Sequence, residues 1–481
     1  MRLKFYSFLT FIHQYCRKDS NFIRLKLFQD KDFNEILSER LILLYWIKRR
    51  EMNFENTLEF AKQQDEKDPL KNYRDQFYIP ILNGKDCIYF TGNSLGLQPK
   101  TAQDYVLAEM ENWANYGVEG HFHGRNPWAN FHEVFSKKLQ PILGAKSEEI
   151  VVMNQLTVNL HLMLITFYRP DQKRYKILCE NRAFTSDVYV IDSQLKLHGL
   201  NPRETLIEMK PREGELTLRN EDIISVIQEN ADQLALVLFG GINYFTGQFF
   251  DLKSIAAAAH EVGAKCGFDL AHAVGNVKLH LHDWNVDFAC WCSYKYLNSG
   301  PGAVAGAFIH NRYATNRLLP RLAGWWGTDK HERFQFKNQF NAIPTAEGWQ
   351  LSNADILSMA AHRAALDIFE EAGFEKIVQK GKRLSAFLLF ILKEVNRQAE
   401  KIVVEIITPQ NENEHGCQIS IFLPEKGKDF LNCLNKNGVI ADWREPNVIR
   451  LTPVPLYNSF EEVFRFGEIL KEFAAKEIEA K

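Results

Sequence analysis

The sequence lacks both a long apolar run and an excess of charge of one sign. No stretch approaches the about 18 consecutive apolar residues that a membrane-spanning helix needs. Its 481 residues carry 58 Lys and Arg against 60 Asp and Glu, a formal net charge of −2 at pH 7. This balance excludes the basic surface of a protein that binds nucleic acid or an anionic membrane. We therefore expect small-molecule and self-association partners.

The cysteines are too scattered for a metal site or a disulfide framework. Eight are present, no Cys-X-X-Cys pair occurs, and Cys290 and Cys292 lie in an apolar run typical of a core strand. Low-complexity tracts and repeats of fixed period are also absent. This pattern indicates reduced thiols in a reducing compartment, so we expect a cytoplasmic protein without a bound metal.

Residues 1–51 form a segment of different character. They mix Lys and Arg with short apolar runs, and the run from Phe5 to Ile12 lacks a small-residue cleavage site, so a secretory signal is not indicated. After Met52 the sequence opens like an ordinary helical start. We interpret residues 1–51 as an N-terminal extension without catalytic role, upstream of the natural start; a weak targeting peptide is the alternative.

Short apolar runs alternate with helical patterns between about residues 148 and 310. The candidate strands are Ile150–Met153, Tyr175–Cys179, Leu234–Phe239, Ala264–Phe268, Phe288–Cys292 and Gly306–Ile309. The candidate helices between them are Asn159–Phe167, Asp222–Glu229 and Leu252–Glu261. This alternation predicts an α/β fold with a mostly parallel sheet, and the continuously apolar run LALVLF favours strands covered on both faces.

The pattern changes after about residue 341. A long helical region is followed by alternating runs, a short helix and a last strand, in the order Ser352 to Arg397, KIVVEIIT, CQISIFL, 426–437 and Val448–Thr452. This order predicts a smaller α+β domain. We place a large domain at 111–345, the small C-terminal domain at 346–481, and an N-terminal arm that packs with it at 52–110. A ligand is expected in the cleft between the two domains.

Two residues that carry chemistry follow neighbouring candidate strands. Asp269 ends one strand, in GFDLAHAVGN, and Lys295 follows the next, in WCSYKYLNSGPG. The chain between them suits one β-α-β crossover, so both are expected at the carboxyl edge of one parallel sheet. Pyridoxal phosphate needs a lysine for its aldehyde and an acid for its pyridine nitrogen. A strand-end cap and a solvated lysine are the alternative, weakened because Lys295 lies in an otherwise uncharged stretch from Phe288 to Ile309.

A phosphate would need oriented donors, and two segments offer them. Thr157, in NQLTVNLHLMLITF, lies where a strand runs into a helix, and a helix N-terminus binds anions. A plain N-cap explains Thr157 equally well. The segment CENRAFTSDVYV also follows a strand and offers Phe184 to stack on a flat ring.

Several runs together resemble the kynureninase family. They occur in order from about residue 89 to 460: YFTGNSLGLQPKTA, WANYGVEGH, GFDLAHAVGNV, DFACWCSYKYLNSGPG, GWWG, RFQF and RLTPVPLYNSF. The third and fourth are highly specific, and the resemblance covers nearly the whole chain after the extension. It implies the fold type I of pyridoxal-phosphate enzymes, with a seven-stranded-type sheet, and a homodimer that shares its active sites.

The resemblance also implies a role for each matching position. The catalytic residues would be Lys295, Tyr294 and Asp269. Others would bind the cofactor: Leu156, Thr157, Phe184, Thr185, Ser186, Asp187, Gly240, His272, Trp325 and Asn353, the last two from the partner subunit. The substrate would meet Ser94, His121, Ser352, Asn353 and Arg450. Arg450 would hold the α-carboxylate, which suits a bidentate guanidinium.

The implied reaction cleaves the Cβ–Cγ bond of a kynurenine-type amino acid with water, giving an anthranilic acid and L-alanine for tryptophan catabolism or NAD synthesis. His121, Ser352 and Asn353 resemble the members that prefer 3-hydroxykynurenine, which we expect to be a good substrate. Two positions depart from the pattern. Gly240 replaces a frequent hydroxyl residue near the phosphate, and Trp326 replaces a smaller aromatic beside the aryl pocket.

Three alternative functions fit the sequence less well than kynureninase. A cysteine desulfurase needs a mobile cysteine well after the lysine, but Cys417, in CQISIFL, has the alternation of a packed strand. An aminotransferase leaves the runs around the aryl pocket unexplained. A catalytically silent scaffold would usually have lost one of its catalytic residues, whereas Lys295, Asp269, Tyr294 and Arg450 are all present.

Overall fold

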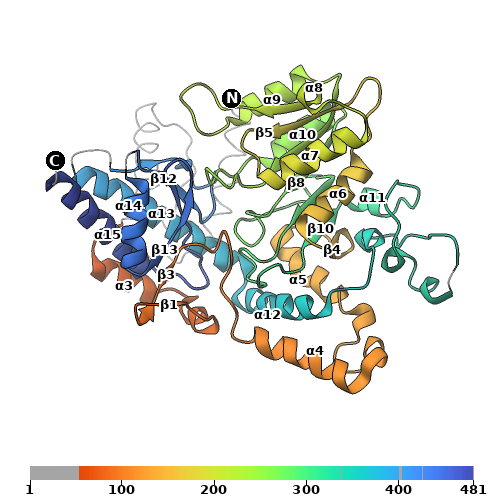
Figure 1. Cartoon of the computed structure of the whole chain (residues 1–481), viewed down its shortest axis with the longest axis horizontal. Helices are drawn as coiled ribbons and strands as arrows, with labels where there is room; N and C mark the ends of the chain where they lie inside the picture. Colours follow the sequence, from red (N-terminus) through yellow and green to blue (C-terminus); the bar gives the residue numbers. More distant parts are fainter. Residues whose placement is uncertain (1–53, 336, 400–402, 425, 480–481) are drawn as a thin grey trace, which may run out of the picture. The chain divides into compact units, whose positions relative to one another are not determined.

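The computed structural model describes residues 54–335, 337–399, 403–424 and 426–479, and Glu55 onward forms one compact unit (Figure 1). The extension predicted at 1–51 lies outside the described residues. Within them, no helix is long and apolar enough to cross a membrane.

A seven-stranded sheet forms the centre of the larger part, in the order β4-β10-β9-β8-β7-β5-β6. The strands are β4 (Ile150–Val152), β5 (Lys176–Glu180), β6 (Leu206–Met209), β7 (Leu234–Gly240), β8 (Lys265–Asp269), β9 (Phe288–Trp291) and β10 (Gly306–Ile309). The pairs from β6 through β9 are parallel, and β10 is antiparallel to β9 and β4. The predicted mostly parallel sheet is confirmed. The edge strand β6 was not predicted, because it is half-exposed and interrupted by Glu208.

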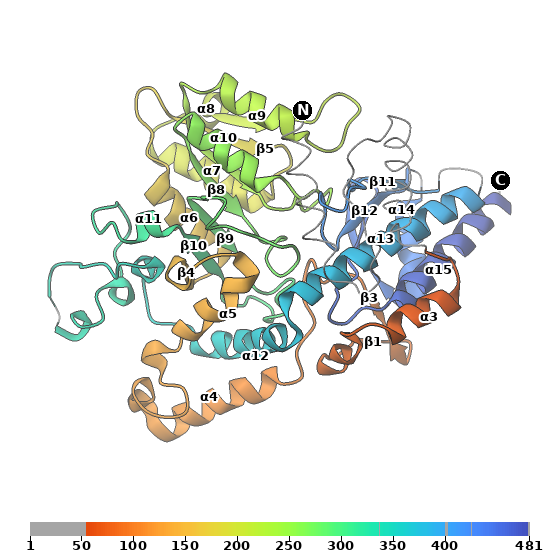
Figure 2. The same ribbon diagram turned by 180° about the vertical axis from the view of Figure 1, so that it is seen from behind.

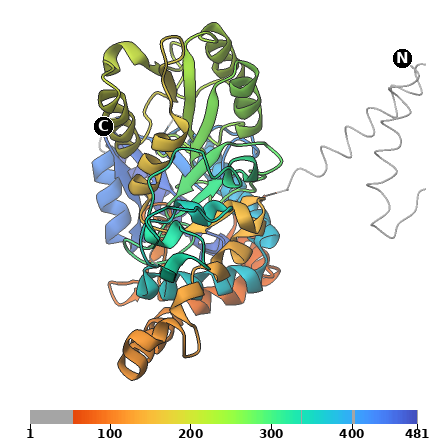
Figure 3. The same ribbon diagram turned by 90° about the vertical axis from the view of Figure 1, so that its right-hand side faces the viewer.

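Helices cover both faces of this sheet (Figure 3). One layer contains α6 (Leu156–Phe167) and α7 (Thr185–Leu197), and the other contains α9 (Asn220–Glu229) and α10 (Leu252–Glu261). Alternate residues of β7 enter the two cores, Leu236 and Leu238 on the α6 side and Val237 and Phe239 on the α10 side. A strand buried on both faces has no polar face, which explains the run LALVLF.

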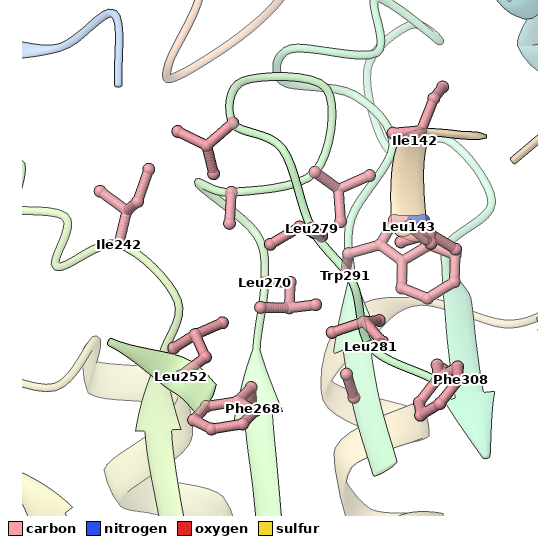
Figure 4. Close-up of a cluster of buried hydrophobic side chains, with 14 of the residues drawn as sticks. Ile142, Leu143, Ile242, Leu252, Phe268, Leu270, Leu279, Leu281, Trp291 and Phe308 are labelled. Atoms are coloured by element: carbon pink, nitrogen blue, oxygen red, sulfur yellow. The ribbon is translucent and has the colours of Figure 1, made fainter. Parts of the chain in front are cut away.

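The remaining helices of the larger part are α4 (Ala102–Tyr116), α5 (Glu133–Leu143), α8 (Pro202–Thr205) and α11 (Asn311–Ala314). The crossover helix expected before Lys295 is absent, since the described chain from 270 to 287 contains turns only. Instead, the Leu281 N–H donates to the carbonyl of Leu143 at the end of α5, and Leu279 is buried beside it (Figure 4). Tertiary contacts of this kind leave no helical period in a sequence.

Two glycines let β9 pack tightly against its neighbours. Gly267 of β8 lies opposite Phe288, and Gly306 of β10 lies opposite Trp291. A Cβ atom would come 2.1 Å from the Phe288 ring at the first glycine and 2.2 Å from the Trp291 ring at the second. The missing side chains therefore leave the space that the two rings fill, which fixes the strand that leads to Lys295.

The smaller part is a four-stranded sheet with helices. Its order is β11-β12-β15-β14, with β11 (Glu405–Ile406), β12 (Ile419–Phe422), β14 (Asp442–Arg444) and β15 (Val448–Leu451). Its helices are α13 (Phe374–Gln398), α14 (Gly427–Lys436) and α15 (Phe460–Glu479), while α12 (Ile356–Ala372), which precedes them, packs mainly against α4 and α5 of the larger part. The single long helix region predicted here is divided, because Gly373 has a φ of 80° between α12 and α13.

The N-terminal arm packs with this smaller part. β3 (Ile88–Tyr89) pairs in parallel with β13 (Val439–Ile440), and α3 (Leu58–Glu66) packs against α15 (Figure 2). A short hairpin, β1 (Ile81–Leu82) with β2 (Lys85–Asp86), lies between α3 and β3 in the chain. The domain boundaries at 110 and 345 stay predictions.

The glycine-to-ring packing leads to a stability prediction. We expect Gly267→Ala to cost about 1–3 kcal/mol in the free energy of unfolding, because the methyl group overlaps the Phe288 ring. Urea unfolding measures this cost. Adding Phe288→Leu should recover part of the loss. If the losses in unfolding free energy of the two single variants simply add in the double variant, the two residues do not pack as described.

Candidate active site

Asp269 and the residues before Lys295 lie at the carboxyl edge of the large sheet, as predicted. β8 ends at Asp269, which lies opposite Cys290 of the neighbouring parallel strand. Lys295 follows four residues after the end of β9, and its Nζ lies 3.0 Å from Nε2 of His272. Both Lys295 and Asp269 are less than a tenth exposed. Burial and the nearby Lys295 charge lower the pKa of His272 well below its usual value, so its ring is neutral and accepts from the lysine.

A cavity of about 230 Å³ opens at this edge. Many of the predicted residues form its wall: Leu156, Thr157, Phe184, Ser186, Asp187, Gly240, Asp269, His272, Tyr294 and Lys295. The structure adds residues that the sequence analysis missed, namely Gln155, Glu180, Ile242, Tyr244 and Ala271. The strand-end position of Glu180 in KILCE was the one available signal for it.

Two helices begin at the cavity wall. In α6 the N-cap is Gln155, whose side chain makes no capping hydrogen bond, so Thr157 is the second helical residue. The plain N-cap interpretation of Thr157 is therefore wrong. The first turn of a helix leaves backbone N–H groups without helical acceptors. α7 starts beside the same wall with Phe184 as an N-cap that has no capping bond either. This pair of helix starts suits an anion such as a phosphate.

Three carboxyl groups line the cavity together with Lys295. Burial raises the pKa of Asp269, and the Lys295 charge opposes this. Burial raises the pKa of Asp187 well above its usual value, and the charge of Asp269 raises it further, so Asp187 keeps its proton and donates to Asp269. Burial also raises the pKa of Glu180 to about 8. The cluster therefore presents Asp269 as its carboxylate, and the Ala271 N–H donates to it at 2.7 Å.

Aromatic rings form part of the cavity wall. Phe184 is 44% exposed, and its ring centroid lies 5.7 Å from Nζ of Lys295. Tyr244 meets the Phe184 ring edge-on at 5.2 Å. The exposed face of Phe184 is available to stack on a flat ligand. Burial raises the pKa of Tyr294, so its hydroxyl keeps its proton.

Arg450 lies next to this wall without lining it. It is 1% exposed on β15, and its Nη1 donates to the Tyr244 carbonyl at 2.8 Å. Its Nη2 donates to Oγ of Ser94 at 3.0 Å and to the carboxylate of Asp442. Arg450 Nε is buried without a partner. The guanidinium is thus held in place through its two terminal nitrogens.

Seven predicted residues do not line the cavity of their own chain: Ser94, His121, Thr185, Trp325, Ser352, Asn353 and Arg450. Thr185 is exposed in the first turn of α7. Trp325 is 45% exposed, with its Nε1 donating to the carbonyl of Arg333, and Ser352 and Asn353 are exposed. Trp326, expected beside the aryl pocket, is 1% exposed and stacks on the Arg333 guanidinium.

The cysteine desulfurase reading needs a reactive thiol, and Cys417 is not one. It is 2% exposed, and burial raises its pKa to about 12. Its backbone N–H donates to the side-chain oxygen of Asn276, just before β12. Cys290 and Cys292 are buried as well, as expected. A buried thiol with a raised pKa is a poor nucleophile.

Solved structures of other proteins share this fold. A cysteine desulfurase from Thermococcus onnurineus superposes with a TM-score of 0.66 at 18% identity, covering 86% of this chain and 98% of that one. A cystine C–S lyase with glycine linked to its PLP cofactor superposes with a TM-score of 0.64 at 16% identity, covering 82% of this chain and 98% of the other. The fold is that of the type I pyridoxal-phosphate enzymes, as predicted.

Sequence comparison gives the family. The kynureninase of Flavobacterium psychrophilum is 54% identical over 420 residues, which is 87% of this chain and 99% of that protein. The human kynureninase is 46% identical over 426 residues, covering 85% of this chain and 91% of the relative. The kynureninase C-terminal domain model matches residues 377–470. The chain belongs to the kynureninase family.

The shared proton of Asp187 leads to a prediction on stability. The folded-state pKa of Asp187 lies above its unfolded value, so the folded chain binds more protons in the interval between them. The stability of the cofactor-free wild type should therefore fall as the pH rises through that interval, and Asp187→Asn should show a smaller fall, because Glu180, whose pKa is raised to about 8, still contributes. Urea unfolding at about pH 5 and about pH 8 measures both. Equal pH dependence of the two proteins would contradict the shared proton.

Proposed function

We propose that the chain is a pyridoxal-phosphate-dependent kynureninase. It cleaves the Cβ–Cγ bond of 3-hydroxykynurenine and kynurenine with water, giving 3-hydroxyanthranilate or anthranilate and L-alanine. One observation carries this proposal: the Lys295 amine lies in a cavity that also contains the buried carboxylate of Asp269. The identity to curated kynureninases over most of the chain supports it.

The cavity fits the cofactor by its donor set. The starts of α6 and α7 offer N–H groups for a phosphate, and Leu156, Thr157 and Tyr294 line that wall. Phe184 presents an exposed ring face. Nδ1 of His272 is buried without a partner in the described chain, as expected for an atom that a ligand reaches. Asp269 would hold the pyridine nitrogen, and the cofactor, when bound, supplies an electron sink.

The chain's own residues then move the protons. The Lys295 amine takes the substrate proton at Cα, and its bond to the neutral His272 ring keeps Nζ aimed into the cavity. The hydroxyl of Tyr294 keeps its proton and can donate it to the alanine fragment after cleavage. Protonation of the alanine fragment needs a donor that reaches the cavity, and Tyr294 lines the cavity.

Arg450 would bind the substrate α-carboxylate, with Ser94 beside it. Its side chain is rigidly held by Tyr244 and Asp442, and a preorganised guanidinium suits a planar carboxylate. The buried Nε without a partner shows that its hydrogen-bonding capacity is not used up.

A second copy of the chain would complete the site. His121, Trp325, Ser352 and Asn353 lie outside their own cavity, and the last three are exposed. Four large apolar side chains of α4 are exposed: Leu107, Met110, Trp113 and Tyr116. Exposed apolar side chains gathered on one helix indicate an interface, and a homodimer accounts for both observations.

The biological setting follows from the reaction. Kynurenine cleavage belongs to tryptophan catabolism, and 3-hydroxyanthranilate can feed NAD synthesis. The cysteines of the described residues are unpaired, which supports a reducing cytoplasmic location.

The activity test uses both substrates. We expect the purified protein with pyridoxal phosphate to release anthranilate-type product from each, with 3-hydroxykynurenine the better substrate. Lys295→Ala should lower kcat at least about a thousandfold, because it removes the proton carrier. Fluorescence of the released product measures both rates. A bound cofactor without cleavage of either compound would overturn the function, and failure to bind it would favour the silent scaffold.

Subunit complementation tests the shared site. Lys295→Ala and Asn353→Ala should each be inactive alone, while an equal mixture, unfolded and refolded together, should regain about a quarter of wild-type activity. The reason is that each mixed dimer contains one intact site if the two residues come from different chains. A mixture that stays inactive would place Asn353 in its own chain's site.

A further inference from the structure

Glu180 is a buried carboxyl in the cavity wall that the proposed mechanism does not use. It is the last residue of β5 and is 3% exposed. Two strand ends away in the sheet order, β8 brings Asp269 to the same edge. A charged group that lines a reaction cavity at this depth acts on the chemistry through its field, because burial lowers the local dielectric screening.

Only one of its two oxygens has a partner among the described residues. Oε1 accepts the Gly240 N–H at 3.0 Å, whereas Oε2 is buried without a hydrogen bond. A Cβ at Gly240 would lie 2.9 Å from Oε1, so the glycine leaves room for the carboxyl. An ionised carboxylate in this position would leave one oxygen uncompensated, while a protonated carboxyl would not carry that charge.

The neighbouring titratable groups add to this effect. Asp269 on β8 faces Glu180 and raises its pKa, after burial, to about 8. Asp187 on α7 and the Cys179 thiol on the same strand are in turn raised by Glu180. Around neutral pH, protons on Glu180 and Asp187 leave Asp269 as the carboxylate of the cluster.

We propose that Glu180 is a positioning residue for the cleavage reaction, which holds a proton at the cavity wall and keeps Asp269 the single carboxylate beside the cofactor ring. The inference rests on the proposed function. The ring must accept negative charge during the reaction, and a second carboxylate would oppose this by Coulomb repulsion. Ionisation of Glu180 therefore switches the site to a slower form.

The kinetic test compares three proteins. Wild-type kcat should fall by up to about tenfold between one pH unit below and one above the Glu180 pKa of about 8, with the full fall if the ionised form is inactive. Glu180→Gln, which cannot ionise, should fall less than about twofold over that range. Glu208→Gln, the same change on the exposed position of neighbouring β6, should follow the wild type. An alkaline fall that persists in Glu180→Gln would overturn the proposal.

Two further measurements cover other failures. The infrared spectrum of the holoenzyme should show a protonated-carboxyl band that disappears near the same pH and is missing in Glu180→Gln. A band that is unchanged in the variant would contradict the proposal.

If Glu180→Gln does not fold, the Gly240→Ala variant tests the proposal instead. Its methyl group should displace Oε1 of Glu180 from the Gly240 N–H, and the loss of this hydrogen bond should raise the Glu180 pKa. The alkaline fall in kcat should therefore move to higher pH. A fall at the same or a lower pH would overturn the proposal. If the wild type binds the cofactor but cleaves no kynurenine, the proposed function is wrong. The infrared band still tests the proton on Glu180, because it does not depend on activity.

Discussion

The burial of the Asp269 carboxyl beside the Lys295 amine is the constraint on which the site depends. Each is less than a tenth exposed, and buried charges are tolerated only with partners. The chain supplies them: the Ala271 N–H donates to Asp269, and neutral His272 accepts from Lys295. The sheet must therefore hold two neighbouring strand ends in register, and the ring that fills the space over Gly267 pins them together.

Charge in the cavity follows from the same constraint. Three carboxyls could not all ionise so close together, and burial raises the pKa of each. At Asp269 alone, the hydrogen bond from Asp187 and the Lys295 charge oppose this rise in pKa, which favours Asp269 as the group that ionises first. On the smaller part, Arg450 and Arg444 share the single carboxylate of Asp442, so this group keeps positive charge for an anionic substrate.

The sequence predicted the sheet and the positions of Asp269 and Lys295 well, because buried strands are apolar on both faces and reactive side chains lie at the carboxyl ends of parallel strands. It failed where tertiary contacts decide: the turns between β8 and β9 depend on α5, and the edge strand β6 has a polar interruption. Glu180 and Tyr244 were missed because strands distant in the chain bring them to the cavity. Exposed Asn353 and Trp325 could not be placed from one chain, since their proposed site belongs to a second.

Borohydride reduction of the holoenzyme, followed by peptide mass mapping, identifies the lysine that binds the cofactor. Reduction fixes the cofactor to the amine that carries it. We expect a cofactor mass on the peptide containing Lys295 and unmodified peptides at the other lysines. A cofactor attached to a different lysine, or no attached cofactor in a protein that shows its absorbance band, would contradict the arrangement of Lys295 and Asp269 as the reaction centre.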